Sequence, residues 1–227
     1  MNLKVRGKER IFWIVLLAAV LVHLAAYMLI AYPAMPQTVP THWGVEGTVD
    51  GWGSKGETIV IAAMPLLIVL LMYAVPRLDP KGRNYDRFLG VYLGASAALT
   101  LFTVAVSWMT PLTAFGVIPE GSTLVTTFVL FMLAVLMLAL GNYMPRVKPN
   151  YMFGIRTPWT LASEDNWRRT HRFAGPVFMA AGMLMVVAAA LSAFAPDVAI
   201  VVELVAVLAA TAIVGVYSYV VWRREGR

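Results

Sequence analysis

Residues 58–75 read TIVIAAMPLLIVLLMYAV, a run of 18 residues without a charged side chain. With 1.5 Å of rise per residue, an α-helix of that length is about 27 Å long, close to the hydrocarbon core of a bilayer. Backbone amides inside lipid must be hydrogen-bonded within their own segment, which favours a helix over any open structure. This stretch therefore predicts a transmembrane helix.

Five further apolar runs of similar length extend this prediction along the chain. They are residues 11–32, 88–109, 122–140, 173–194 and 198–222. Charged residues make up only 13% of the chain, about half the share that soluble domains carry. The sequence also lacks the short alternating runs that are typical of membrane β-barrels. It predicts an all-α integral membrane protein with a bundle of six transmembrane helices.

Positive charge is confined to every second connection between these runs. Apart from Lys55, the 18 Lys and Arg residues lie before the first run, within 76–87, within 141–172, or after the last run. Cytoplasmic loops carry the Lys and Arg excess, so the N and C termini and the basic loop 141–172 are predicted to be cytoplasmic. The net charge of +6 then reflects membrane orientation, and no direct nucleic-acid partner is expected.

The loop at residues 33–57 is predicted to be extracellular and contains five glycines and three prolines, which break helices. Two short extended segments, 39–43 and 48–52, are expected around a turn at 44–47. The alternative is a loop that only connects two spans, although idle connections of this length are uncommon.

The predicted cytoplasmic loop 141–172 has two halves of different character. Its first half is expected to be non-helical at Pro145, Pro149 and Pro158, because proline lacks a backbone N–H and restricts the residue before it. In the second half, Ser163 is expected to cap a short interfacial helix that bends into the fifth span.

Two ionisable residues, His23 and Glu203, lie inside predicted spans at similar depths. Charges in lipid are costly and usually face a partner or a cavity, so a contact between these two residues is one hypothesis. The alternative is that each side chain forms a hydrogen bond locally or reaches the membrane interface.

No metal, cofactor or catalytic site is expected from the sequence. The chain has no cysteine, which excludes disulfides and thiolate metal sites. His42 and His171 lie in loops on opposite sides of the predicted membrane, so they cannot share a zinc ion. No motif pairs a nucleophile with a base, which predicts a protein that is not an enzyme.

Two segments resemble a known family. The first match is GNYMP at 141–145, KPNY at 148–151 and GIRTPWT at 154–160, followed by Trp167, Thr170, His171, Arg172 and Gly175. These residues resemble the signature of the SdpI family. Loop 33–57 is similar to a small domain of unknown function often found at the start of such proteins, with PTHW at 40–43, Gly47, DGWG at 50–53 and SK at 54–55.

The resemblance implies a multi-pass protein of the plasma membrane of a bacterium or archaeon. The named member of the family gives immunity against a secreted killing peptide and holds a transcriptional repressor at the membrane. By resemblance, residues 1–75 would form an amino-terminal two-span unit, and residues 76–227 an SdpI-like four-span unit. The implied function is to bind or shield against an antimicrobial peptide outside and to relay to a cytosolic regulator, with the lipid bilayer as the constant partner.

Two sets of candidate residues follow from this reading. Those expected to face a toxin are His42, Trp43, Asp50, Trp52 and Lys55. Those expected to form a cytoplasmic signature or relay site are Asn142, Tyr143, Lys148, Asn150, Tyr151, Gly154, Arg156, Thr157, Trp159, Trp167, His171 and Arg172. The loop 141–172, called the signature loop below, could pack helix ends and grip anionic lipid, dock a cytosolic partner, or serve catalysis or gating.

Two other functions stay open on the sequence alone. A small transporter or lipid-handling protein would use the intramembrane groups His23 and Glu203 together with Thr100, Thr103 and Ser107. An enzyme acting on a lipid-linked substrate would need a polar pocket around Arg156 and His171.

Overall fold

The computed structural model describes residues 3–226, with side chains from Gly7 onward. The side chains of Lys4 and Arg6 and the whole of Arg227, which the charge pattern includes, lie outside the described part. The helices, strands and short 3-10 or π segments are α1 (Leu3–Ala26), η1 (Tyr27–Ala31), α2 (Tyr32–Ala34), β1 (Thr38–Trp43), β2 (Val49–Ser54), η2 (Lys55–Glu57), α3 (Thr58–Leu78), η3 (Gly82–Phe88), α4 (Leu89–Ser107), α5 (Met109–Ala114), α6 (Leu124–Tyr143), η4 (Met144–Arg146), α7 (Pro158–Ala162), α8 (Glu164–Leu191) and α9 (Pro196–Arg224).

Among the described residues, six helical segments are long and apolar enough to cross a membrane, which confirms the predicted six-helix membrane fold. Their bounds are Gly7–Ala34, Lys55–Leu78, Gly82–Ala114, Leu124–Arg146, Glu164–Leu191 and Pro196–Arg224. Each overlaps one predicted run.

The chain divides into two compact units. The first unit contains the chain up to Tyr73 together with Leu93–Val129, and the second contains Ala74–Tyr92 together with the chain from Leu130 onward. Both units are therefore built from segments that are separated in the sequence. The division into residues 1–75 and 76–227, which the family resemblance implied, stays a prediction.

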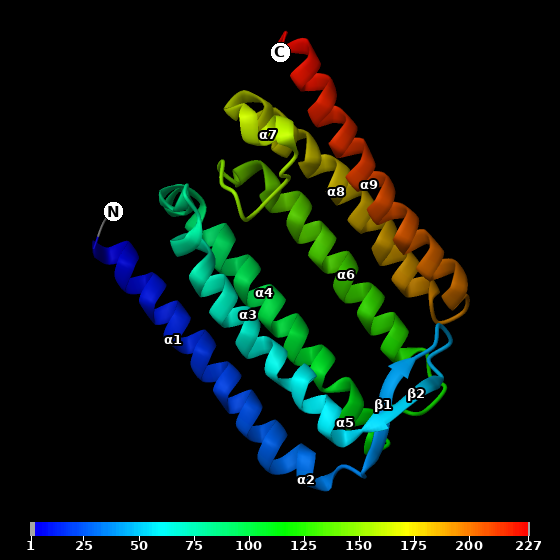
Figure 1. Cartoon of the computed structure of the whole chain (residues 1–227). Coiled ribbons are helices and arrows are strands. Elements are labelled where there is room, and N and C mark those ends of the chain that lie inside the picture. Colours follow the sequence, from blue (N-terminus) through cyan, green and yellow to red (C-terminus); the bar gives the residue numbers. More distant parts are fainter. Residues whose placement is uncertain (1–2, 227) are drawn as a thin grey trace. The chain divides into compact units, whose positions relative to one another are not determined.

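The first unit contains a β-hairpin, Thr38–Ser54, which is called the hairpin below. Strands β1 and β2 pair antiparallel, with Thr38 opposite Ser54 and Trp43 opposite Val49. This confirms the two extended segments expected around residues 44–47, and the hairpin is an addition to the all-helical prediction. Figure 1 shows it adjacent to α5, where β1 packs on that helix.

Polar contacts and one glycine hold the hairpin on the rest of the first unit. The Thr110 hydroxyl donates to the carbonyl of Pro40 at 3.0 Å, and the Thr126 hydroxyl donates to the carbonyl of Val45 at 3.1 Å. Gly47 has a φ of +79°, and a Cβ there would lie 1.9 Å from the backbone oxygen of Ser122. At Gly47 the turn therefore approaches a neighbouring backbone more closely than a residue with a Cβ would permit.

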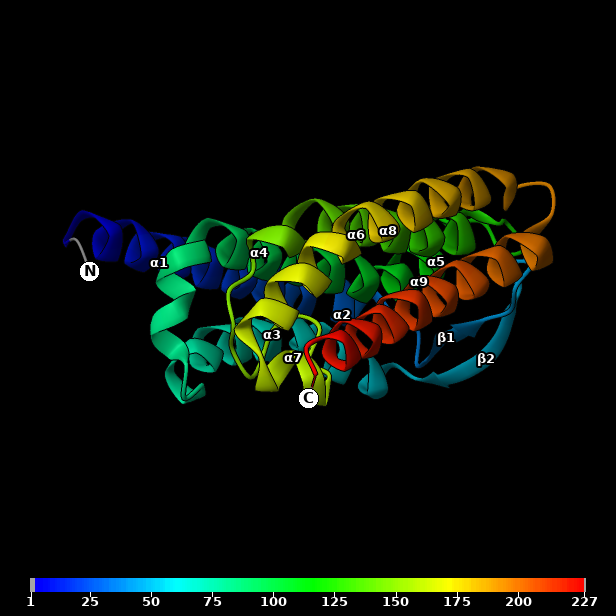
Figure 2. The same ribbon diagram turned by 90° about the horizontal axis from the view of Figure 1, so that it is seen from above.

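In the second unit, α8 and α9 form an antiparallel helical hairpin, with only residues 192–195 between them. The two helices lie side by side in both views of the molecule (Figures 1 and 2). The Phe173 and Tyr217 rings stack between them, with centroids 4.0 Å apart.

Helix α6 packs on α8 through glycines. A Cβ at Gly141 would lie 2.6 Å from the Met179 nitrogen, and a Cβ at Gly182 would lie 2.8 Å from the Leu138 side chain. Small residues at such contacts allow helix backbones to approach closely in lipid, where apolar burial alone gives little driving force for association.

Two sequence expectations for the signature loop were wrong. Pro145 lies in the 3-10 segment η4, and Pro158 is the first residue of α7, where its missing N–H has no partner to lose. The expected short interfacial helix is also not separate, because Ser163 caps a continuous helix of 28 residues that includes the fifth span. Pro176 lies within this helix, and the cap at Ser163 agrees with the sequence.

Candidate functional site

Three of the five residues expected to face a toxin are exposed on the hairpin. His42 Nδ1 lies 2.5 Å from Asp50 Oδ1, and both side chains are exposed. The Trp52 indole, on the strand of Asp50 and two residues further on, is 53% exposed. Gly51 lies opposite His42, and a Cβ there would lie 2.8 Å from the Cβ of His42. We call His42, Asp50 and Trp52 the hairpin face.

The other two candidates in this loop, Trp43 and Lys55, are half-buried. Lys55 Nζ donates to the carbonyls of Tyr32 and Met35 at 3.4 Å each and lies 4.9 Å from the centroid of the Tyr32 ring. Lys55 therefore ties the end of β2 to the segment before β1. The geometry assigns Lys55 a structural role. The exposed polar and aromatic side chains are those of the hairpin face.

His23 is a structural link within the first unit. Trp108 Nε1 donates to His23 Nδ1 at 3.1 Å, since an indole N–H can only donate, and His23 Nε2 then donates to the carbonyl of Ala62 at 3.2 Å. Both ring nitrogens are used locally, as one sequence alternative expected. The hypothesis of a His23–Glu203 contact joins residues of the two units and stays a prediction.

Hydroxyl groups that could have supported transport donate to their own helix. In α4, the Thr100 hydroxyl donates to the carbonyl of Ser96, that of Thr103 to the carbonyls of Leu99 and Thr100, and that of Ser107 to the carbonyl of Val104. This arrangement satisfies the polar groups inside the helix itself.

Glu203, on α9 of the second unit, is 5% exposed. Neither of its carboxylate oxygens has a hydrogen-bond partner within residues 3–226. Buried carboxylates are normally partnered, so this residue is unusual even for a membrane helix.

Within the signature loop, Asn150 organises the backbone. Its Oδ1 accepts from the amides of Met152 and Phe153 at 2.9 and 2.6 Å, and its Nδ2 donates to the carbonyls of Lys148 and Phe153 at 2.8 Å each. Asn150 is 1% exposed. Its amide therefore folds residues 148–153 into a compact turn.

Asp79 and Tyr85, which the sequence reading did not select, connect Ala74–Tyr92 to the signature loop. Asp79 is 5% exposed, and its carboxylate accepts from the amides of Lys81 at 2.7 Å and Tyr151 at 2.8 Å and from the Tyr85 hydroxyl at 3.0 Å. The same hydroxyl lies 3.2 Å from Asn150 Oδ1, so its single proton serves two acceptors in turn. The available signal was that this basic loop also carries carboxylates, at Asp79 and Asp86.

Trp167 and His171 hold the signature loop from the side of α8. Their rings stack with centroids 4.1 Å apart, and Trp167 Nε1 donates to the carbonyl of Val147 at 3.0 Å. The Ile155 amide donates to His171 Nε2 at 3.1 Å, so the ring proton is on Nδ1 and is donated to the carbonyl of Trp167. Gly154 has a φ of +111°, and a Cβ there would lie 2.6 Å from His171 Nε2.

The remaining signature candidates divide into structural and accessible residues. Thr157 caps α7, and the Trp159 ring packs 5.1 Å from that of Tyr219 on α9. Lys148 is half-buried. The accessible members are Asn142, Tyr143, Tyr151, Arg156 and Arg172.

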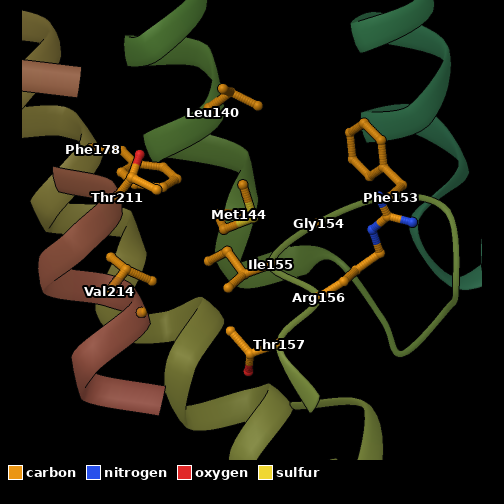
Figure 3. A pocket seen from close by; sticks show the side chains of 11 residues that line it. Leu140, Met144, Phe153, Gly154, Ile155, Arg156, Thr157, Phe178, Thr211 and Val214 are labelled. Atoms are coloured by element: carbon orange, nitrogen blue, oxygen red, sulfur yellow. The ribbon is translucent and has the colours of Figure 1, made fainter. Parts of the chain in front are cut away.

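A cavity of about 420 Å³ lies within the second unit, beside residues 153–157 of the signature loop. Its walls come from α6, α8 and α9, and Figure 3 shows Met144, Ile155 and Val214 around it, with the Arg156 side chain extending toward Phe153. Most of the lining is apolar, and its cationic residue is Arg156. No group of three or more His, Cys, Asp or Glu side chains that could hold a metal ion occurs within residues 3–226.

Comparison with known proteins identifies both segments that the sequence singled out. Residues 146–218 match the SdpI/YfhL protein family, and residues 13–69 match a domain of unknown function, DUF1648. The chain is 27% identical over 191 residues to Immunity protein SdpI of Bacillus subtilis (strain 168), covering 84% of this chain and 86% of that protein. No solved structure matches. The resemblance to the SdpI family is confirmed, and none of these names is that of an enzyme.

Proposed function

We propose that this chain, which resembles the SdpI family through residues 146–218, is a multi-pass membrane protein that protects its cell against a secreted killing peptide. The similarity to a protein named for immunity extends over nearly the full length of both chains. Within the structure, the observation that carries the proposal is the hairpin face, an exposed aromatic and charged patch on a hairpin that is held in place.

The hairpin is proposed to lie outside the cell and the signature loop inside, with both termini cytoplasmic. The distribution of Lys and Arg supports this orientation, because Lys55 alone lies in a connection of the outer parity. Lys55 is also held by two carbonyls and a tyrosine ring. A plasma membrane location in a bacterium or archaeon follows from the same proposal.

The hairpin face has the properties of a peptide-binding patch. Tryptophan is enriched among the residues that dominate binding energy, and the adjacent His42–Asp50 pair offers polar partners. The contacts of Thr110, Thr126 and Gly47 fix the hairpin before any ligand arrives. A preorganised patch loses less conformational entropy on binding.

The signature loop is proposed to act mainly as a scaffold, with a smaller accessible part that could relay to a cytosolic regulator. Asn150, Gly154, Trp167 and His171 are committed to contacts within the second unit. The exposed side chains of Tyr143, Tyr151, Arg156 and Arg172 are the part on which a regulator would dock.

The immunity proposal is tested by complementation. A Bacillus subtilis strain that lacks its own Immunity protein SdpI would express this chain, and its survival would be measured in the presence of the killing peptide. We expect survival well above that of the empty-vector strain. Survival equal to the empty vector, with the protein present in the membrane at the level of the native relative, would contradict the proposal.

Trp52→Ala is expected to lower this protection at least about tenfold, because loss of a central aromatic contact costs about 2 kcal/mol or more of binding. The unfolding midpoint should hardly change, since the ring is 53% exposed. Phe194→Ala is the matched control, because Phe194 is an exposed aromatic residue in the turn between α8 and α9. Equal protection by the two variants would remove the hairpin face from the toxin site.

A further inference from the structure

The cavity of the second unit changes in polarity along its length. Leu140, Phe178 and Val214 supply apolar lining from the helices, whereas Gly154, Arg156 and Thr157 line it from the signature loop, with the Arg156 guanidinium beside Phe153 (Figure 3). Thr211 lies about 13 residues before the end of α9 at Arg224, roughly 20 Å along the helix axis. The apolar part therefore lies at the depth of lipid chains, and the cationic part lies near the end of the spans.

Glycine creates the space on the α9 side. Gly215 lines the cavity, and a Cβ built on it meets no atom within 4 Å. The neighbouring lining residue Thr211 is exposed, and its hydroxyl donates to the carbonyl of Val207 on its own helix. The α9 wall is thus open at a position that faces the apolar interior of the cavity.

Arg156 is available to an anion. Its Nη1 donates to the carbonyl of Tyr151 at 2.6 Å, which fixes one side of the guanidinium. None of the ion pairs in the described part of the chain involves Arg156, and residues 141–160 contain no carboxylate. The planar guanidinium is well suited to a phosphate because it presents several donors in a fixed geometry.

We propose that this cavity binds an anionic phospholipid, with one acyl chain against Leu140, Phe178 and Val214 and the headgroup phosphate at Arg156. A volume of about 420 Å³ lies in the range of small-molecule pockets. Basic pockets between membrane helices on the cytoplasmic side are known to receive anionic headgroups. The site is independent of the hairpin face and adds a lipid ligand to the proposed immunity function.

A lipid accounts for the site better than a free anion or a peptide does. A free phosphate would use Arg156 and leave the apolar part without an occupant. A peptide segment carries backbone amides that need hydrogen-bond partners in an apolar site, whereas an acyl chain carries none. The cavity combines an apolar part at the depth of lipid acyl chains with a cation, and this combination fits an anionic amphiphile.

Native mass spectrometry of the full-length protein in detergent tests the proposal, with phosphatidylglycerol and phosphatidylcholine of identical acyl chains added in equal amounts. Wild type should retain phosphatidylglycerol about tenfold more than phosphatidylcholine, because both carry a phosphate but the choline cation of phosphatidylcholine offsets its attraction to the arginine. Arg156→Gln should reduce this ratio to about one. Gly215→Leu, which fills the α9 side of the cavity, should lower the retention of both lipids about tenfold.

Matched variants separate the cavity from general effects. Gly90→Leu is the control for Gly215→Leu, because a Cβ at Gly90 also meets no atom within 4 Å and Gly90 does not line the cavity. Arg224→Gln is the control for charge, at an exposed cation at the end of α9. If Gly215→Leu does not fold, Thr211→Trp fills the same space from an exposed position.

Several results would overturn the proposal. Folded cavity-filling variants that retain both lipids at the wild-type level would contradict a lipid in the cavity. The same holds if Arg156→Gln keeps the wild-type headgroup preference, or if wild type retains no lipid. Displacement of phosphatidylglycerol by an equal concentration of inorganic phosphate would also overturn it, because it would identify a free-anion site.

Discussion

Gly47→Ala is expected to lower the free energy of unfolding by at least about 3 kcal/mol, a large effect for a single substitution. The new Cβ would lie 1.9 Å from the backbone oxygen and 2.7 Å from the carbonyl carbon of Ser122, and backbone atoms cannot swing aside as a side chain can. The φ of +79° adds strain for any residue other than glycine. The hairpin should separate from the Ser122–Thr123 backbone, and toxin protection should fall with it.

Gly116→Ala is the control for this prediction. Gly116 also has a positive φ, +71°, but a Cβ there meets no atom within 4 Å. This substitution should cost only about 1 kcal/mol, the effect of backbone conformation alone. Thermal unfolding of the purified proteins, with hydrogen exchange of the hairpin amides, measures both. Equal losses of stability in the two variants would show that the contact of Gly47 with Ser122 contributes nothing.

Asp79→Ala is expected to cost about 2–5 kcal/mol, because it leaves two backbone amides without an acceptor and the Tyr85 hydroxyl with Asn150 alone, and each unsatisfied buried group costs about 1–3 kcal/mol. The donors are the amides of Lys81 and Tyr151 and the Tyr85 hydroxyl. The signature loop should then lose protection against hydrogen exchange around Tyr151, and the unfolding midpoint should fall.

Asp86→Ala tests whether this effect comes from the hydrogen bonds of Asp79 or from the loss of one negative charge in a basic loop. Asp86 carries the same group in the same loop and is exposed. Exposed substitutions away from such networks change stability by about 0.5 kcal/mol or less. A loss of similar size at Asp79 and Asp86 would refute the role given to the Asp79 network.

The sequence predicts the features of this fold that depend on local composition. Apolar length locates the six helices, glycines on both sides of a short turn locate the hairpin strands, and the serine at position 163 locates a helix start. Each of these properties acts through neighbours within a few residues. They are therefore visible in a single sequence.

The part that could not be predicted depends on distant partners. The loop around Asp79 was read only for its positive charge, because the amide of Tyr151 lies 72 residues further along the chain. Likewise, the sequence indicates Trp167 and His171 only as members of the family signature. Their burial depends on Val147 and Ile155, which pattern reading places in a separate irregular segment.

The hydrogen bonds between Asn84 and Pro149 and between Tyr85 and Asn150 each span 65 residues, which has a consequence for biosynthesis. At about 5–20 residues per second, the ribosome needs roughly 3–13 s to add that length of chain. During this interval Asp79 and Tyr85 have already been synthesised, but their later partners do not yet exist. The second unit therefore closes only after most of the chain has been translated, and a pause in synthesis before position 150 would leave this buried carboxylate without the amide of Tyr151.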